Sequence, residues 1–106
     1  MSRDSSHLLD ILKAAKLALK EEFSKDTQCQ DAVIRRLEII GEAAGRVSVA
    51  TTAKFPSLPW KKMVSMRNIM IHEYEDVDLG IVWETVQNEL PPLISLLEPL
   101  IPKEEA

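Results

Sequence analysis

The chain has 106 residues, 45% of them apolar, and a formal net charge of −4. These values suit one domain, 1–106, and exclude a disordered chain and a general nucleic-acid binder. A single cysteine, Cys29, excludes an internal disulfide, and no apolar run reaches the roughly 20 residues that a membrane helix needs. With no apolar signal segment at its N-terminus, the chain is expected to be cytoplasmic.

Two amphipathic helices are predicted in the first half of the chain. The first begins at Ser5 or Ser6 and ends near Phe23, with apolar residues every three or four positions. Its apolar stripe consists of Leu8, Leu12, Ala15, Leu19 and Phe23, flanked by Ile11 and Ala18. The second begins at Asp26 or Thr27 and extends to about Ala50, with a stripe that consists of Val33, Ile34, Leu37, Ile40, Ala44 and Val47.

Gly41 and Gly45 lie on one face of the second helix, four residues apart. Glycine inside a helix costs about 1 kcal/mol relative to alanine, so the pair indicates close approach of another backbone. That backbone belongs to a helix of this chain or to a second subunit.

The second half of the chain predicts two more helices. A connection from Thr51 to Pro59 precedes a third helix, which begins at Pro59 or Trp60 and ends at Ile71 or His72. This helix is apolar on most sides, which suggests that a subunit interface buries its second side. A fourth helix, capped by Asp78, extends to about Leu97 with a kink upstream of Pro91. Four helices with short connections predict an all-α, antiparallel four-helix bundle.

Candidate catalytic groups lie at the end of the third helix: Arg67, Asn68, His72 and Tyr74. Five of the 13 basic residues and none of the 17 acidic ones lie between Ala43 and His72, so a positive field could surround them. Arg67 and Tyr74 are separated by about 700° around an ideal helix and nearly align, whereas Arg67 and His72 lie about 140° apart. Arg67 and His72 converge only if the helix ends near His72 or a second copy contributes.

Two arginines and two histidines across a two-fold axis suit metal-independent RNA cleavage. A histidine can accept the proton of the 2′-hydroxyl as it attacks the phosphate, and a second can protonate the leaving oxygen. The Arg67 guanidinium can stabilise the added negative charge. A metal site fits less well, because His72 lacks the paired histidine of helical zinc sites. A purely structural role also suits these residues: Arg67 pairs with a carboxylate, His72 caps the helix and Tyr74 packs on the bundle.

The motif Arg67-x-x-x-x-His72-x-Tyr74 resembles the R-x-x-x-x-H-x-Y motif of HEPN ribonucleases. The chain is more specifically similar to the HepT-like toxins, partners of MNT-type minimal nucleotidyltransferases. The similarity also covers residues 30–34 and 37–44, Pro59-Trp60, Met66-Arg67-Asn68, Val77-Asp78, Val82-Trp83 and Leu90-Pro91.

This resemblance implies a homodimeric HEPN-like bundle with its active cleft at the dimer interface. It implies that the protein is the endoribonuclease toxin of a type VII-like toxin–antitoxin system. The enzyme would cut RNA, with a tRNA as one candidate substrate, and would need no metal or other cofactor. Arg67 and His72 would be catalytic, with Asn68 as a supporting polar residue. The nucleotidyltransferase antitoxin would transfer AMP to Tyr74 and so inhibit cleavage.

One departure from the family pattern is Glu73, where many relatives carry a small residue such as glycine. A carboxylate beside His72 repels RNA phosphate, which puts the strength of the activity in doubt. Glu73 and the net acidity leave open a different class of function. The chain would then be a non-catalytic helical module, an adaptor that holds a nucleotidyltransferase partner.

Overall fold

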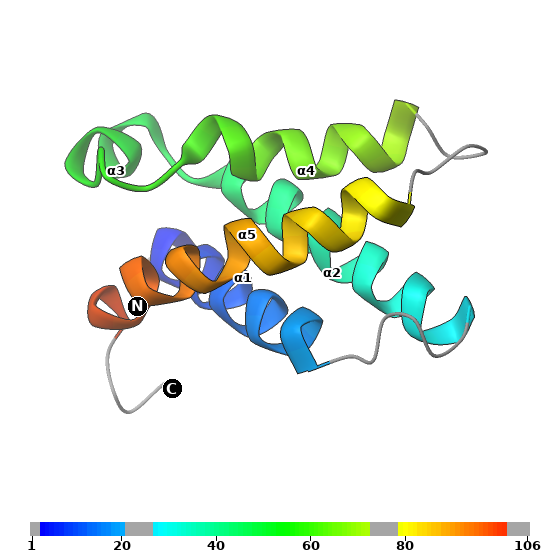
Figure 1. Ribbon diagram of the computed structural model, residues 1–106. Helices are drawn as coiled ribbons and strands as arrows, with labels where there is room; N and C mark the ends of the chain where they lie inside the picture. The colour runs from blue at the N-terminus through cyan, green and yellow to red at the C-terminus, as the bar shows by residue number, and fades with distance from the viewer. Residues whose placement is uncertain (1–2, 21–26, 73–78, 102–106) are drawn as a thin grey trace.

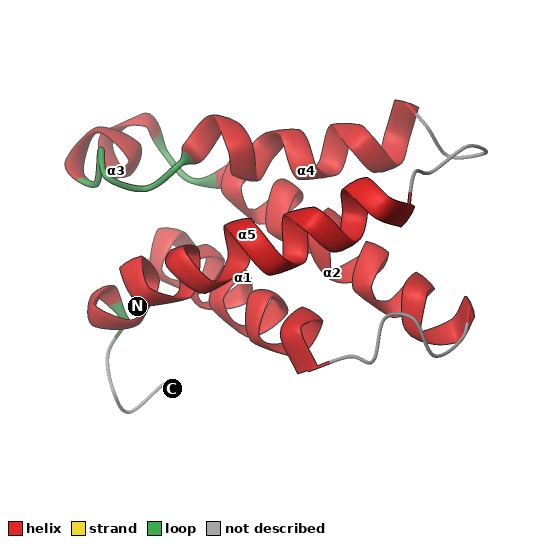
Figure 2. Ribbon diagram, in the orientation of Figure 1, coloured by secondary structure: helices red, strands yellow, loops and turns green. Residues whose placement is uncertain are grey.

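The computed structural model describes residues 3–20, 27–72 and 79–101; for residues 27, 68–72 and 79 it describes the backbone alone. Every element in these ranges is helical, which confirms the all-α class (Figure 2). The elements in chain order are α1 (Arg3–Lys20), α2 (Thr27–Arg46), α3 (Val49–Lys54), α4 (Trp60–His72), α5 (Leu79–Leu97) and the 3₁₀-helix η1 (Glu98–Leu100).

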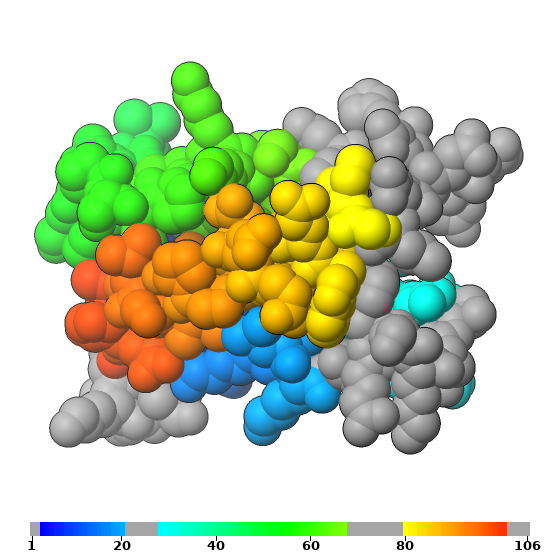
Figure 3. Space-filling model, in the orientation of Figure 1, coloured from blue at the N-terminus to red at the C-terminus, as the bar shows by residue number. Residues whose placement is uncertain are grey.

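The helix α2 is the centre of the arrangement, because it packs against both α1 and α4. The helix α5 packs against α1, and successive long helices run in opposite directions (Figure 1). In the space-filling view, α5 lies across the front of the molecule between α4 and α1 (Figure 3). Arg67, the first of the predicted site residues, belongs to α4, which packs against α2.

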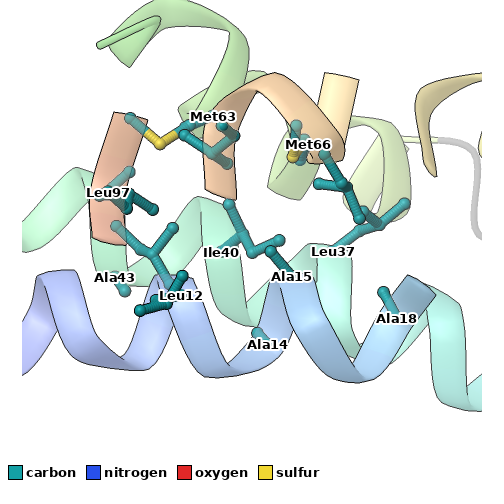
Figure 4. Close-up of a cluster of buried hydrophobic side chains, with 14 of the residues drawn as sticks. Leu12, Ala14, Ala15, Ala18, Leu37, Ile40, Ala43, Met63, Met66 and Leu97 are labelled. Atoms are coloured by element: carbon teal, nitrogen blue, oxygen red, sulfur yellow. The ribbon is translucent and has the colours of Figure 1, made fainter. Parts of the chain in front are cut away.

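One hydrophobic core joins α1, α2, α4 and α5, as the apolar stripes predicted. Figure 4 shows Leu12 and Ala15 of α1, Ile40 of α2, Met63 of α4 and Leu97 of α5 turned toward one another. Burying each leucine, isoleucine or methionine of this set contributes about 1.5–3 kcal/mol. In the fourth helix too, apolar residues recur every three or four positions and predict a buried stripe, but one of them, Ile81 of α5, is 47% exposed. Phe23 lies outside the described residues.

The prediction that the second helix continues to Ala50 is wrong. The helix α2 ends at Arg46, and the short helix α3 then occupies residues 49–54, part of the expected connection. Ser48 separates the two helices with an extended backbone (φ −65°, ψ 154°), and its hydroxyl accepts a bond from the Thr51 N–H at 3.3 Å. This is an N-cap, which begins a new helix instead of prolonging the old one.

Asp4 of α1 holds this corner in place from a distance of 44 residues along the chain. Its carboxylate accepts hydrogen bonds from the Ser48 hydroxyl at 2.6 Å, the Ser48 N–H at 3.1 Å and the Thr51 hydroxyl. These bonds favour the ionised form, so the Ser48 and Thr51 hydroxyls, followed by the Ser48 N–H, lower the pKa of Asp4. The clasp ties the start of α1 to the segment that leads into α4.

The remaining boundaries agree with the sequence except at the start of α1. The helix α1 begins at Arg3, two or three residues before the predicted caps. The bounds of α4, Trp60–His72, confirm the predicted third helix. The helix α5 contains Pro91 and Pro92 and is assigned as one helix through both, so the expected kink stays a prediction. The predicted cap, Asp78, lies outside the described residues.

Candidate functional site

Arg67 is placed by a very close approach of α4 to α2. Its backbone faces Gly41, where an added Cβ would lie 2.5 Å from both the nitrogen and the Cβ of Arg67. Met63 and Met66, which precede Arg67 on α4 by four residues and one residue, are buried in the core and hold the helix against α2. The Arg67 side chain itself is exposed. The packing therefore fixes the backbone of this arginine and leaves its guanidinium accessible.

Gly45 does not share the role of Gly41, although both were predicted to admit a neighbouring backbone. A Cβ added at Gly45 would meet no atom of the described residues within 4 Å, and Gly45 is exposed. The two helices are thus tightest at Gly41 and leave open space one helical turn later. The prediction is confirmed for Gly41; at Gly45 no described residue of this chain approaches, and approach by a second subunit stays a prediction.

The open space is a pocket of about 380 Å³ between α2 and α4, lined among the described residues by Glu42, Gly45, Arg46 and Arg67. Within the described part of the chain, no carboxylate forms an ion pair with Arg46 or Arg67. Two guanidiniums and one carboxylate give this lining a net positive charge. Guanidinium groups donate in a planar fork that matches phosphate oxygens, so the pocket is suited to a phosphate.

Arg46 is the site residue that motif reasoning missed, since it lies 21 residues before Arg67. The segment from residue 43 to residue 72, which has basic but no acidic residues, indicated a cationic site. It contains five basic residues, and the sequence alone does not show which of them lie close together. The structure separates them. Lys62 pairs with Glu89 of α5 at 3.4 Å, and the Lys54 ammonium lies 5.7 Å from the centre of the Phe55 ring. Arg46 and Arg67 alone among the five line this pocket.

The other predicted site residues are only partly placed. Asn68 and His72 belong to α4, whose backbone is helical through His72, but their side chains lie outside the described residues. Glu73 and Tyr74 lie outside the described residues altogether. A regular helix through position 72 sets Arg67 and His72 about 140° apart around its axis. The two positions therefore lie on different sides of one copy of α4.

The described side chains include no cluster of metal ligands: no three of the types His, Cys, Asp and Glu gather in one place. His72 and the acidic residues 73–78 are not among these side chains. None of the helices in the described ranges has the length and apolar character to cross a bilayer.

Residues 6–100 match the HepT-like family, described as ribonuclease HepT-like. The curated relatives include a protein of Methanocaldococcus jannaschii named "Putative RNase MJ1380", 40% identical over 95 residues, which cover 81% of this chain and 85% of the relative. A protein of Thermococcus cleftensis named "Probable ribonuclease HepT" is 41% identical over 80 residues, which cover 76% of this chain and 73% of the relative.

A third relative is longer. "Gamma-glutamylcyclotransferase and putative RNase MJ0434" of Methanocaldococcus jannaschii is 39% identical over 97 residues. The match covers 83% of this chain and 41% of that protein, so the chain spans less than half of the relative's length. No solved structure gives a significant match.

Proposed function

The chain belongs to the ribonuclease HepT-like family, and we propose that it is a metal-independent endoribonuclease toxin that uses Arg67 and His72. One observation carries the proposal. The Arg67 side chain is exposed at the edge of an open pocket, beside Arg46, and no described carboxylate neutralises it. An arginine that served the fold alone would be expected to pair with a carboxylate. The pocket argues against that structural alternative for Arg67.

The reaction needs no group beyond those of the protein and the RNA. The 2′-hydroxyl oxygen attacks the adjacent phosphorus while a His72 imidazole accepts its proton. The bond from phosphorus to the 5′-oxygen breaks, and a second, protonated imidazole gives that oxygen a proton. The products are a 2′,3′-cyclic phosphate and a 5′-hydroxyl. Arg67 stabilises the additional negative charge on the phosphate oxygens. Asn68 supports the reaction by a hydrogen bond to a phosphate oxygen or to a histidine.

Two copies are needed for this chemistry. Because the backbone of α4 is helical through His72, positions 67 and 72 of one chain lie about 140° apart around the helix axis. A two-fold axis beside α4 brings the guanidinium of one copy toward the imidazole of the other. We therefore propose that residues 1–106 form one domain, an antiparallel four-helix bundle, and that two such bundles form a homodimer with the cleft at their interface.

Control of the activity is assigned to Tyr74. An antitoxin of the minimal nucleotidyltransferase class would direct the Tyr74 hydroxyl to the α-phosphorus of ATP, forming the phosphodiester and releasing pyrophosphate. The AMP group adds a negative charge two residues after His72, where RNA phosphate must bind. In this proposal the protein is the toxin of a type VII-like toxin–antitoxin system that acts on cytoplasmic RNA, with tRNA as a candidate substrate.

The test is cleavage of RNA by the purified, unmodified protein in EDTA. We expect cyclic phosphate ends, and we expect Arg67→Ala and His72→Ala each to lower the rate by at least about 100-fold, as for a lost acid–base or charge-stabilising group. Arg35→Ala is the matched control, since Arg35 is an exposed arginine of α2 paired with Glu38 outside the pocket. Light scattering must show that all variants keep the oligomeric state of the wild type.

Two results would contradict the proposal. Cleavage that needs a divalent metal, or that survives in both variants, would reject the assigned mechanism. A protein that cuts no RNA, yet forms a stable complex with a nucleotidyltransferase whether or not residue 72 is histidine, would be the non-catalytic adaptor.

A further inference from the structure

We propose that Arg46 and Gly45 form a second phosphate subsite, which holds the RNA backbone next to the phosphate bound by Arg67. This inference rests on the proposed ribonuclease function, because it concerns the substrate of the same cleft. Arg46 comes from the last turn of α2 and Arg67 from α4, and both line one pocket of about 380 Å³. Two exposed guanidiniums from different helices are therefore available to one bound strand.

The two arginines enter the pocket at different levels. The backbones of α2 and α4 meet at Gly41 and Arg67. Arg46 lies five residues beyond Gly41, which places its Cα about 7.5 Å further along the axis of α2. Arg46 thus extends the positive lining away from Arg67, as a strand with a phosphate at each nucleotide would require.

Glycine at position 45 lowers the stability of α2, and no contact with another described residue of the chain requires it. A helical glycine is less stable than alanine by about 0.5–1 kcal/mol, and an alanine Cβ here would touch nothing within 4 Å. Gly41, by contrast, is required by the contact with Arg67. The missing side chain at position 45 keeps the pocket open beside Arg46, so we assign its role to substrate access.

The lining also indicates how this subsite reads RNA. Among the described residues it contains no aromatic side chain on which a base could stack. Guanidinium contacts to phosphate fix the position of a strand and carry no base information. We therefore expect single-stranded RNA to be held here through its backbone, with the same affinity for different bases.

Binding can be measured without cleavage in a His72→Ala background. The probes are fluorescein-labelled oligouridylate and oligoadenylate, followed by fluorescence anisotropy over a range of salt concentrations. We expect Arg46→Gln to weaken both by about tenfold, and to reduce the slope of log K against log salt by about 0.7, the value for one phosphate contact on a single strand. Arg35→Gln, the matched control on α2, should change neither quantity.

Gly45 is tested by size. The methyl group of Gly45→Ala should narrow the pocket and weaken RNA binding measurably, whereas Gly45→Leu should fill the pocket and weaken binding by at least about tenfold. Thermal unfolding must show both variants to be at least as stable as the parent, so that lost binding reports access and not folding. Equal binding by the leucine variant would overturn the assignment of Gly45.

The results separate the subsite from the catalytic proposal. If the wild type cuts RNA but Arg46→Gln binds and cuts it normally, the subsite is wrong and the ribonuclease stands. If the wild type cuts nothing while RNA binding still depends on Arg46, the subsite stands and the ribonuclease fails. If Arg46→Gln weakened the binding of only one of the two oligonucleotides, the proposal that the subsite binds RNA through its phosphates alone would be wrong.

Discussion

Gly41 and Arg67 lie so close that a β-carbon on the glycine would be 2.5 Å from both the backbone nitrogen and the Cβ of the arginine. The contact joins the predicted catalytic residue to the central helix through main-chain atoms, which cannot move aside as a flexible side chain can. The position of Arg67 therefore depends on a residue 26 positions earlier that has no chemistry of its own.

A methyl group at position 41 should disturb both stability and activity. Gly41→Ala forces α4 away from α2, and we expect a loss of about 1–3 kcal/mol in the free energy of unfolding, as for other overpacked positions. Gly45→Ala should instead stabilise by about 0.4–1 kcal/mol, because it restricts the unfolded chain and meets open space. Urea denaturation of the two variants measures the difference. Equal stability of the pair would show that α2 and α4 are not in close contact in solution.

Mixing wild type with His72→Ala tests whether the cleft is shared between copies. A mixed dimer carries one His72 imidazole, whereas the proposed reaction uses two. We expect unfolding and refolding the two together to lower cleavage to about the square of the wild-type fraction, because mixed dimers are then inactive. Native mass spectrometry shows whether mixed dimers have formed. Cleavage that falls only in proportion to the wild-type fraction, with mixed dimers present, would place a complete site within one chain.

Coexpression with a minimal nucleotidyltransferase tests control through Tyr74. We expect the intact mass to rise by one or more AMP groups and RNA cleavage to fall, because the added phosphate competes with RNA for the cationic cleft. Tyr74→Phe has no hydroxyl to attack ATP and should stay unmodified and active. The same gain in mass by the phenylalanine variant would assign the modification to another residue.

The Asp4 clasp predicts a stability contribution that disappears in acid. Hydrogen bonds from Ser48 and Thr51 lower the pKa of Asp4 in the folded protein. The carboxylate therefore stabilises the fold at pH values above its ordinary pKa of about 3.9, and that contribution is lost as the pH falls through the lower, folded value. Wild type should melt above Asp4→Asn at pH 7, and the gap should close in strong acid.

Asp10→Asn is the control for this measurement, since Asp10 is an exposed aspartate of the same helix. Its melting temperature should follow that of the wild type at every pH. A gap between wild type and Asp4→Asn that stays constant down to low pH would mean that the charge of Asp4 contributes nothing to the clasp.

Features that depend on neighbours along the chain could be predicted from the sequence. The all-helical class, the bounds of α4 and the burial of residues such as Leu12, Ile40 and Val86 follow from apolar residues spaced by three and four. Helical periodicity is a local property, so one sequence is sufficient to detect it. The motif of Arg67 and His72 is local in the same sense, and its catalytic role stays a prediction.

Features that depend on residues far apart in the chain could not be predicted from the sequence. The early end of α2 reflects bonds between Ser48 and Asp4, 44 positions apart. No periodicity distinguishes Gly41 from Gly45, because the difference arises where α4 crosses α2.

The sequence by itself determined that the protein is helical, which faces its helices bury and which eight-residue stretch carries reactive groups, since each is written in the spacing of nearby residues. Only the tertiary structure decided that Gly41 supports Arg67, that Gly45 opens a pocket and that Arg46 joins Arg67 there. The physical reason is that the crossing of two helices brings together residues far apart in the sequence, and the spacing of nearby residues does not show which of them will be in contact.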